Sequence, residues 1–169
     1  MSVGMVNRWS KCLLVLAIAF FYTLVFFNNV TDYDSNYQFV HHVLQMDSTF
    51  PGNKGMWRAI NSPAIHTAFY LSIICWEGLT CFTLWIAGTR LALAAKRTAA
   101  EFGRAKGLVI AGLTLGMLLW FVAFLSVGAE WFLMWQSKQW NGQDAAFRLF
   151  VILGIVLLYV SAPEPVEHA

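Results

Sequence analysis

The sequence predicts an all-α protein, a four-helix transmembrane bundle with a short amphipathic helix in its first outward loop. The first observation is composition: 59% of the 169 residues are hydrophobic, only 12% are charged, and the mean hydropathy is +0.59. A soluble domain typically carries about 25% charged residues, so an ordinary soluble globular protein is excluded. The second observation is that the apolar residues form four long stretches, whose only acidic or basic side chains are Glu77, Glu130 and Arg148. Stretches of about 20 apolar residues are long enough to cross a bilayer.

The first span, residues 12–30, follows two basic residues, Arg8 and Lys11. A basic flank before an apolar run also occurs in cleaved signal peptides, but no Ala-x-Ala-like cleavage site follows this run. We therefore expect the segment to be retained as a membrane span.

The polar connection after the first span contains an expected helix over Asn36–Met46. Tyr37, Val40 and Leu44 recur there at helical spacing, and Ser35 precedes them as the expected N-cap. One face of this helix is apolar and the other is polar. We therefore expect it to lie on the membrane surface or on the end of the bundle.

The second, third and fourth spans are expected over residues 64–88, 107–135 and 145–162. The third contains Gly112 and Gly116 in a Gly-x-x-x-Gly pattern, which permits the close approach of another helix. The segments between the spans are too short to bury a hydrophobic core of their own. We therefore expect a single integral membrane domain over residues 1–169.

Basic residues are distributed unequally between the two sides of this topology. Seven lie on one side: Arg8, Lys11, Arg90, Lys96, Arg97, Arg104 and Lys106. Four lie on the other: Lys54, Arg58, Lys138 and Arg148. Positive charge near span ends disfavours translocation, so both termini and loop 89–106 are expected in the cytoplasm. Loop 31–63 then faces outward.

Glu77 lies about halfway along the second span, where a charged side chain costs at least about 2.5 kcal/mol. It is therefore expected to face the bundle or to be protonated. One interpretation is structural, a neutral Glu77 hydrogen-bonded to Tyr22, which lies at a similar depth. The other is functional, with Glu77 as a proton or cation site whose protonation is coupled to conformation.

Glu130 lies near the outer end of the third span, where water and lipid headgroups reach it. A local ion pair with Arg58, Lys138 or Arg148 is the simplest explanation, and the sequence does not choose among these partners. A ligand-binding acid is the alternative.

The histidines raise the question of haem or metal, because a membrane bundle can hold haem between His residues on facing helices. Only His66 lies on a span, near its outer end. A metal or haem that joins His66 with His42 on the outer face is geometrically conceivable. We therefore predict no cofactor, with His42 and His66 as the candidates for an outer-face metal or haem.

Five segments carry a resemblance that covers nearly the whole chain. They are residues 28–33, 43–53, 57–60, 130–137 and 140–143. On these segments the chain resembles a bacterial family of predicted small integral membrane proteins with a domain of unknown function. The resemblance implies a four-span protein of the bacterial inner membrane. It transfers no catalytic or binding residue, because the family has no established activity.

On the derived topology all five segments lie on the outer side. There Asn28, Arg58, Glu130 and Trp131 would contribute to a rigid polar cap. The structural interpretation is that the cap closes the bundle end with satisfied hydrogen bonds. The functional interpretation is that it docks another membrane subunit or a periplasmic protein, because aromatic and Arg side chains are enriched at binding hot spots.

These patterns define several function classes and exclude one. Nucleic-acid binding has no support, because the basic residues lie beside span ends, where topology explains them. No motif defines a reaction, so we expect a non-enzymatic accessory or scaffold subunit of a larger membrane assembly, or a homo-oligomer, in the lipid bilayer. The alternative is a small transporter or channel that uses Glu77 as its proton or cation site. A third class is a redox subunit that binds haem or quinone.

Overall fold

The computed structural model describes residues 2–164. The chain is 81% helical, and the described residues form no strand, so the predicted all-α fold is confirmed. Four of its five main helices are long and apolar enough to cross a membrane. The helices are α1 (Val3–Thr31), α2 (Tyr33–Gln45), α3 (Pro63–Ala94), α4 (Ala99–Leu118), which continues as the π-helix η2 (Leu119–Trp131), and α5 (Gln143–Ser161).

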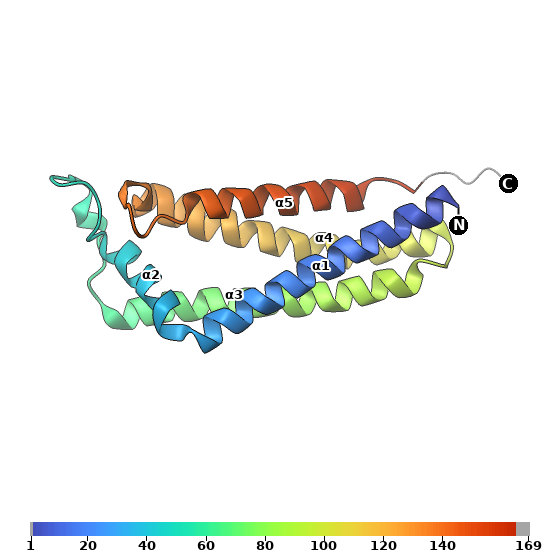
Figure 1. Cartoon of the computed structure of the whole chain (residues 1–169), viewed down its shortest axis with the longest axis horizontal. Helices are drawn as coiled ribbons and strands as arrows, with labels where there is room; N and C mark the ends of the chain where they lie inside the picture. The colour runs from blue at the N-terminus through green and yellow to red at the C-terminus, as the bar shows by residue number, and fades with distance from the viewer. Residues whose placement is uncertain (1, 165–169) are drawn as a thin grey trace.

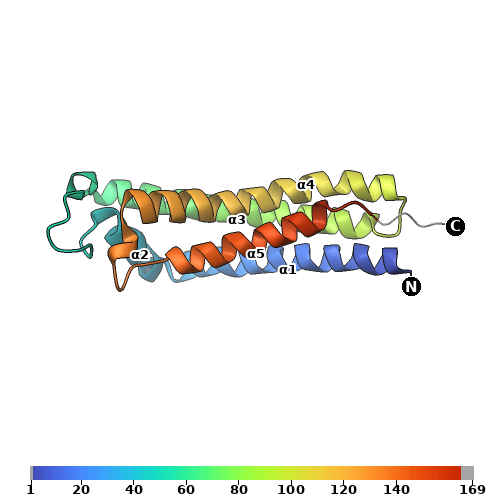
Figure 2. The same ribbon diagram turned by 90° about the horizontal axis from the view of Figure 1, so that it is seen from above.

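The four long helices lie side by side and alternate in direction (Figures 1 and 2). α3 lies between α1 and α4 and packs on both, and α5 packs on α4 and η2. The start of α1 and the end of α5 lie at one end of the bundle, which we call the termini end (Figure 1). α2 and the longer loops lie at the opposite end, which we call the α2 end. Because the number of membrane-crossing helices is even, the start of the first and the end of the last lie on the same side.

The amphipathic helix begins earlier than its pattern predicts. α2 starts at Tyr33, and its N-cap residue is Asp32, so the expected N-cap at Ser35 is wrong. The Tyr33 ring packs edge-on against Tyr70 of α3, with centroids 4.9 Å apart. This contact holds the first turn of α2 against the bundle. The helix therefore begins at Tyr33, directly after the end of α1. α2 ends at Gln45, and its C-cap residue, Met46, has a left-handed backbone.

The third long helix changes its winding along its length. It begins with a capping box, in which the Thr98 side chain accepts from the Glu101 amide and the Glu101 carboxylate accepts from the Thr98 amide. From Leu119 the winding is that of a π-helix, and at its end the amide of Phe132 donates to the carbonyl of Val127, five residues earlier. The helix ends at Trp131, short of residue 135, because Leu133 is left-handed with φ of 56°.

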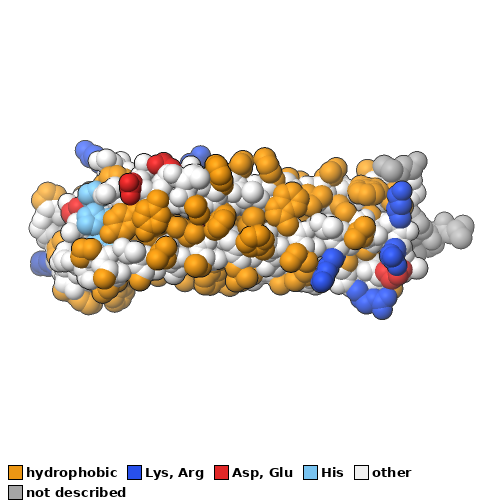
Figure 3. Space-filling model, turned by 90° about the horizontal axis from the view of Figure 1, so that it is seen from below, with side chains coloured by type: hydrophobic (Ala, Val, Ile, Leu, Met, Phe, Trp, Pro, Cys, Tyr) orange, Lys and Arg blue, Asp and Glu red, His pale blue; other side chains and the backbone are white. Residues whose placement is uncertain are grey.

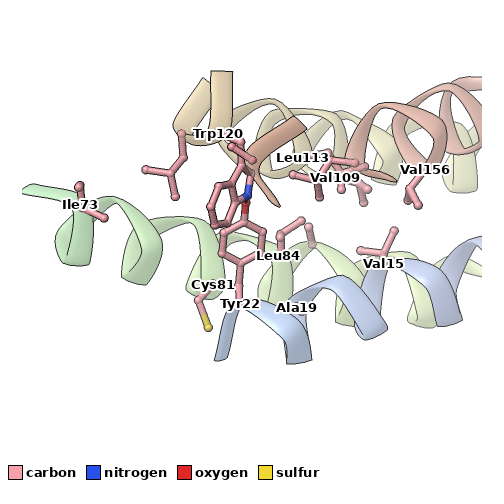
Figure 4. Close-up of a cluster of buried hydrophobic side chains, with 14 of the residues drawn as sticks. Val15, Ala19, Tyr22, Ile73, Cys81, Leu84, Val109, Leu113, Trp120 and Val156 are labelled. Carbon is pink, nitrogen blue, oxygen red and sulfur yellow. The ribbon is translucent and has the colours of Figure 1, made fainter. Parts of the chain in front are cut away.

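The buried centre of the bundle contains one polar pair among apolar side chains (Figure 4). The indole N–H of Trp120 donates to the hydroxyl of Tyr22 at 2.9 Å, and both residues are buried. Leu84 and Leu113 are fully buried toward the termini end of this pair. Because lipid offers no hydrogen bonds, this pairing satisfies two polar groups inside the apolar core.

The Gly-x-x-x-Gly pattern lies where helices approach closely, as its residue types suggest. A Cβ atom at Gly116 would lie 2.5 Å from the Tyr22 hydroxyl oxygen, and one at Gly112 would lie 2.8 Å from Leu84 Cδ2. Both distances are shorter than real Cβ contacts, so a larger residue at either position would displace Tyr22 or Leu84.

The first prediction concerns this contact. Gly116→Ala is expected to lower the free energy of unfolding by about 1–3 kcal/mol, because the added methyl group displaces Tyr22 from Trp120. The measurement is thermal unfolding in detergent. Gly107→Ala is the matched control, because no atom lies within 4 Å of a Cβ there. An equal loss of stability in both variants would show that the loss does not come from the Tyr22 contact.

The termini end is held together by buried charges, and basic side chains gather there on the surface as well (Figure 3). The Glu164 carboxylate accepts from Lys11 at 2.9 Å and from Lys106 at 2.5 Å. Both ammonium groups also donate to the carbonyl of Ala162, at 2.9 and 2.7 Å. These residues follow or belong to three different helices, so the cluster ties α1, α4 and the end of α5 to one another.

Burial by itself raises the pKa of the Glu164 carboxyl, but hydrogen bonds from Lys106 and Lys11 outweigh it and hold the pKa below its ordinary 4.5. A group with a lowered pKa stabilises the folded state above its unfolded pKa, and that contribution is lost as the pH falls. We therefore expect the thermal stability of the protein to decrease as the pH falls below about 4.5.

The second prediction is that Glu164→Gln lowers the free energy of unfolding by about 3 kcal/mol, because two buried ammonium groups lose their counter-charge. It also removes most of the acid sensitivity. Arg97→Gln is the control, since its pair with Glu101 is exposed and contributes less than about 1 kcal/mol. Thermal unfolding across a pH series measures both effects, and a Glu164→Gln protein with wild-type stability contradicts the assignment.

Candidate functional site

Glu77 lies inside the bundle in the middle of α3, with 1% of its surface exposed. Its two carboxylate oxygens accept hydrogen bonds from the side-chain amide of Asn29 in α1, at 3.1 and 2.9 Å. Over residues 2–164, Asn29 is the one residue seen to donate to it. A single neutral amide therefore faces a carboxylate at the depth of the membrane.

The amide of Asn29 is itself fixed in orientation. Its oxygen accepts from the Tyr70 hydroxyl at 3.1 Å, and its nitrogen also donates to the carbonyl of Val25 at 3.2 Å. The Tyr70 hydroxyl is 2.9 Å from the backbone oxygen of Asn29 as well. Since Tyr70 donates to the amide oxygen, the amide nitrogen is the atom that faces Glu77, with one N–H group shared by the carboxylate and the other directed to the carbonyl of Val25.

The structural interpretation of Glu77 named a different partner, and that partner is wrong. The Tyr22 hydroxyl oxygen accepts from the indole N–H of Trp120, and no hydrogen bond joins Tyr22 to Glu77 among the described residues. The residue of α1 that contacts the Glu77 carboxylate is Asn29, which lies two helical turns after Tyr22.

A cavity of about 300 Å³ opens beside this carboxylate. Its walls come from α1, α2, α3, η2 and the start of α5. The side chains that matter for its chemistry are those of Asn29, Phe39, Tyr70, Glu77, Trp120 and Phe124. A smaller cavity of about 30 Å³ lies under α2 among apolar side chains and contains no ionisable group.

The cavity lies where α1 and α5 diverge. At the termini end the two helices touch, because the Tyr159 hydroxyl contacts Ser10 at 2.6 Å and Asn7 at 2.8 Å. Toward the α2 end they separate (Figure 1). Asn28 of α1 and Ala145 of α5 are exposed on the cavity rim, so the opening faces sideways, toward the lipid.

The outer segments that were expected to form a polar cap do contact one another at the α2 end. Ser48 donates to Ser137 at 2.9 Å, and the amide of Phe50 donates to the side-chain oxygen of Gln136 at 3.0 Å. The amide of Ile60 donates to the carbonyl of Leu44 at 2.9 Å. The cap therefore satisfies many of its own polar groups.

Arg58 and Glu130 lie in this cap but do not form the ion pair that was considered for them. The Arg58 guanidinium donates to backbone oxygens of Trp131 and Glu130, at 3.1 and 3.4 Å, and lies over the rings of Trp57 and Trp131. The Glu130 side chain is exposed, and its carboxylate makes no ion pair within the described chain. Lipid headgroups and water reach this depth, which explains why Glu130 needs no partner.

Comparison with known families gives a match to the one described as "Predicted small integral membrane protein (DUF2165)", over residues 7–163. The chain belongs to this family. No curated protein and no solved structure matches it. The family match covers all four long helices, the Glu77 cavity and the cap, so the protein is an integral membrane protein and these features lie within its family domain.

In this family member the histidines pair differently from the arrangement that was considered for a metal. His66 contacts His41, with 2.9 Å between their Nδ1 atoms, and its Nε2 lies 2.7 Å from the carbonyl of Ile60. His42 instead contacts Asp47 at 2.6 Å and stacks on Trp140. His42 and His66 are thus turned to separate partners. Residues 2–164 contain no group of three or more side chains arranged to hold a metal ion.

The pair of His41 and His66 makes the docking of α2 sensitive to acid. A carbonyl oxygen only accepts, so His66 carries its hydrogen on Nε2 and accepts from His41 at Nδ1. Burial lowers the pKa of His41 below 6.5, and the charges of His66 and His42 lower it further, against a small opposing effect of Asp47. An undocked α2 would expose His41 and bind its proton more readily, so acid favours undocking.

The third prediction is that α2 loosens as the pH falls below 6.5, the ordinary pKa of histidine. Hydrogen–deuterium exchange of the α2 amides, corrected for intrinsic rates, measures the effect. His41→Phe keeps a ring against Tyr37 and removes the proton, so its exchange should depend less on pH; an unchanged dependence would refute the role of His41.

Sequence reasoning identified Glu77 but missed most of the residues around it. Asn29, Tyr70, Phe39 and Phe124 were not singled out, although all line the cavity. Asn29 carried a signal, because an amide next to the apolar run of the first span requires a hydrogen-bond partner. The aromatic residues carried none, since rings are common in membrane spans.

Proposed function

We propose that the protein binds a proton or a cation at Glu77 and acts as a small transporter or channel of the membrane. The observation that carries the proposal is a buried carboxylate, facing a cavity of about 300 Å³, with one neutral amide as its hydrogen-bond donor. An ionised carboxylate at membrane depth is costly unless its charge is compensated. A proton on Glu77 or a cation in the cavity supplies that compensation.

The packing on either side of Glu77 supports an alternating mechanism. The cavity opens near the α2 end, whereas the core toward the termini end is closed by Tyr22, Trp120 and Leu84 (Figure 4). A carrier needs such a one-sided opening in each of its states. In the proposed mechanism this arrangement is one state of the carrier, and the second is reached by rearrangement around Tyr22 and Trp120.

For the accessory or scaffold function, the cap is the relevant feature. Its polar groups bond largely to one another, and its exposed rings, such as Trp57 and Trp131, match the aromatic belts of membrane interfaces. A cap that only closes the end of the bundle would have both the internal hydrogen bonds and the exposed rings. No contact in the described chain favours a partner subunit, a haem or a quinone over this role.

For orientation we propose that the termini end faces the cytoplasm of a bacterial inner membrane. The basic residues Arg8, Lys96 and Arg104 belong to the excess of positive charge at that end. The cavity then opens in the outer half of the bilayer.

The fourth prediction is that Glu77→Gln reduces cation-dependent or proton flux into proteoliposomes at least about tenfold, because the amide cannot exchange a proton or hold a cation. Flux of H⁺, Na⁺ and K⁺ is followed with an internal pH dye and with isotopes. Glu130→Gln is the matched control, with an exposed carboxylate on a neighbouring helix and wild-type flux expected. Normal flux in a folded Glu77→Gln protein would overturn the proposal.

Native mass spectrometry of protein purified from its own membranes distinguishes the alternatives. A monomer or homo-oligomer without cofactor is the result that the transport proposal expects. A stoichiometric foreign subunit would support the accessory function, and a retained haem or quinone would support the redox function.

A further inference from the structure

We infer that the cavity at Glu77 takes a small organic cation, an ammonium group carrying apolar substituents, which reaches it from the lipid between α1 and α5. This inference rests on the proposed function and adds the chemical class of the ligand. It is carried by the size of the cavity, the kinds of side chain on its walls and the position of its opening.

The size favours an organic molecule over a bare ion. Binding sites for small organic ligands begin at about 300 Å³, and this cavity has that volume. A bare Ca²⁺ ion would need about six to eight oxygen ligands. Here the two oxygens of Glu77 already accept from Asn29, and the side-chain oxygen of Asn29 is taken by Tyr70.

The walls favour a cation that is also apolar. Phe39, Tyr70, Trp120 and Phe124 line the cavity with rings. The Trp120 and Phe124 ring centroids lie 4.9 Å apart, and those of Phe39 and Phe124 lie 6.2 Å apart. Rings of this kind attract a cation over their faces and bury its apolar substituents, while the carboxylate supplies the opposite charge.

Hydrogen bonds to other protein groups hold two of these rings, Trp120 and Tyr70, in place. The indole N–H of Trp120 is held by Tyr22, and the Tyr70 hydroxyl is held by Asn29. Their polar atoms are therefore occupied by protein. The wall around Glu77 therefore combines these aromatic rings with the amide side chains of Asn28, Asn29 and Asn36.

The opening matches a ligand that arrives through the membrane. The cavity rim includes Asn28 and Asn36 on the side toward α2 and Ala145 on α5. A cation with apolar substituents concentrates at the bilayer interface, and the two amide side chains lie on its path to Glu77. A strongly hydrated inorganic ion would instead have to shed its water at an opening that faces lipid.

The test uses benzyltrimethylammonium as the probe and neopentylbenzene, its neutral carbon isostere, as the matched ligand. Binding of the tritiated cation to the full chain in detergent is measured by equilibrium dialysis. We expect saturable binding that Glu77→Gln abolishes and that neopentylbenzene does not displace. The two ligands share their shape, so the difference reports the charge alone.

A second variant tests the rings without touching the carboxylate. Phe124→Leu keeps an apolar side chain and removes one π face, so it should weaken binding of the cation about fivefold. Phe121→Leu is its control, because Phe121 lies on the same π-helix and is 48% exposed on the outer surface. Both variants are first checked for a wild-type melting temperature.

The outcomes separate the ligand class from the proposed function. Binding that survives Glu77→Gln, or that neopentylbenzene displaces equally well, would overturn the organic-cation inference. Flux of H⁺ or Na⁺ that depends on Glu77, with no binding of benzyltrimethylammonium, would also overturn it and would leave the proposed function standing. If neither flux nor binding depends on Glu77, both proposals fail.

Discussion

The hydrogen bonds between Asn29 and Glu77 are the contact on which the α2 half of the molecule depends. A carboxylate placed among membrane helices must find its donors inside the protein, because lipid offers none. Asn29 meets this requirement from α1, and Tyr70 of α3 holds the amide in the orientation that does so. The end of α1 is thereby fixed against the middle of α3, and the turn into α2 follows directly.

Aromatic stacking then carries this placement into α2. Tyr33, Tyr37 and His41 lie on one face of the helix at successive turns and stack on one another in order. Tyr33 and Tyr37 also contact Tyr70, and His41 contacts His66. Because the same Tyr70 orients Asn29, the docking of α2 and the geometry at Glu77 are connected through one side chain. Phe39, on the same helix, is held over the cavity as a result.

Much of the fold followed from composition, because four apolar runs in one chain have few alternative arrangements in lipid. The cost of a charge at membrane depth also singled out Glu77 without a structure.

The hydrogen-bond partner of Glu77 could not be found in that way. Counting residues from the span ends assumes that all spans begin and end at the same depth, and this assumption pointed to Tyr22. Here α1 does not extend as far toward the α2 end as the start of α3 does (Figure 1), so Asn29 rather than Tyr22 reaches Glu77. The buried cluster of Lys11, Lys106 and Glu164 was missed for a related reason, since basic residues beside span ends are already explained by topology.

The same difference in length explains why there is a cavity. α3 and η2 extend further toward the α2 end than α1 and α5 do (Figure 1). Over that stretch the bundle has two long helices instead of four, and α2 with its loops fills the space. α2 supplies Phe39 and Val40 to the wall but does not replace a full helix between α1 and α5. At the termini end the buried ammonium groups and Glu164 keep those two helices together, so the gap opens only at the α2 end. A carboxylate in a cavity that is also lined by four aromatic rings is a feature that packing alone does not require, and it is the main physical reason to expect a ligand there.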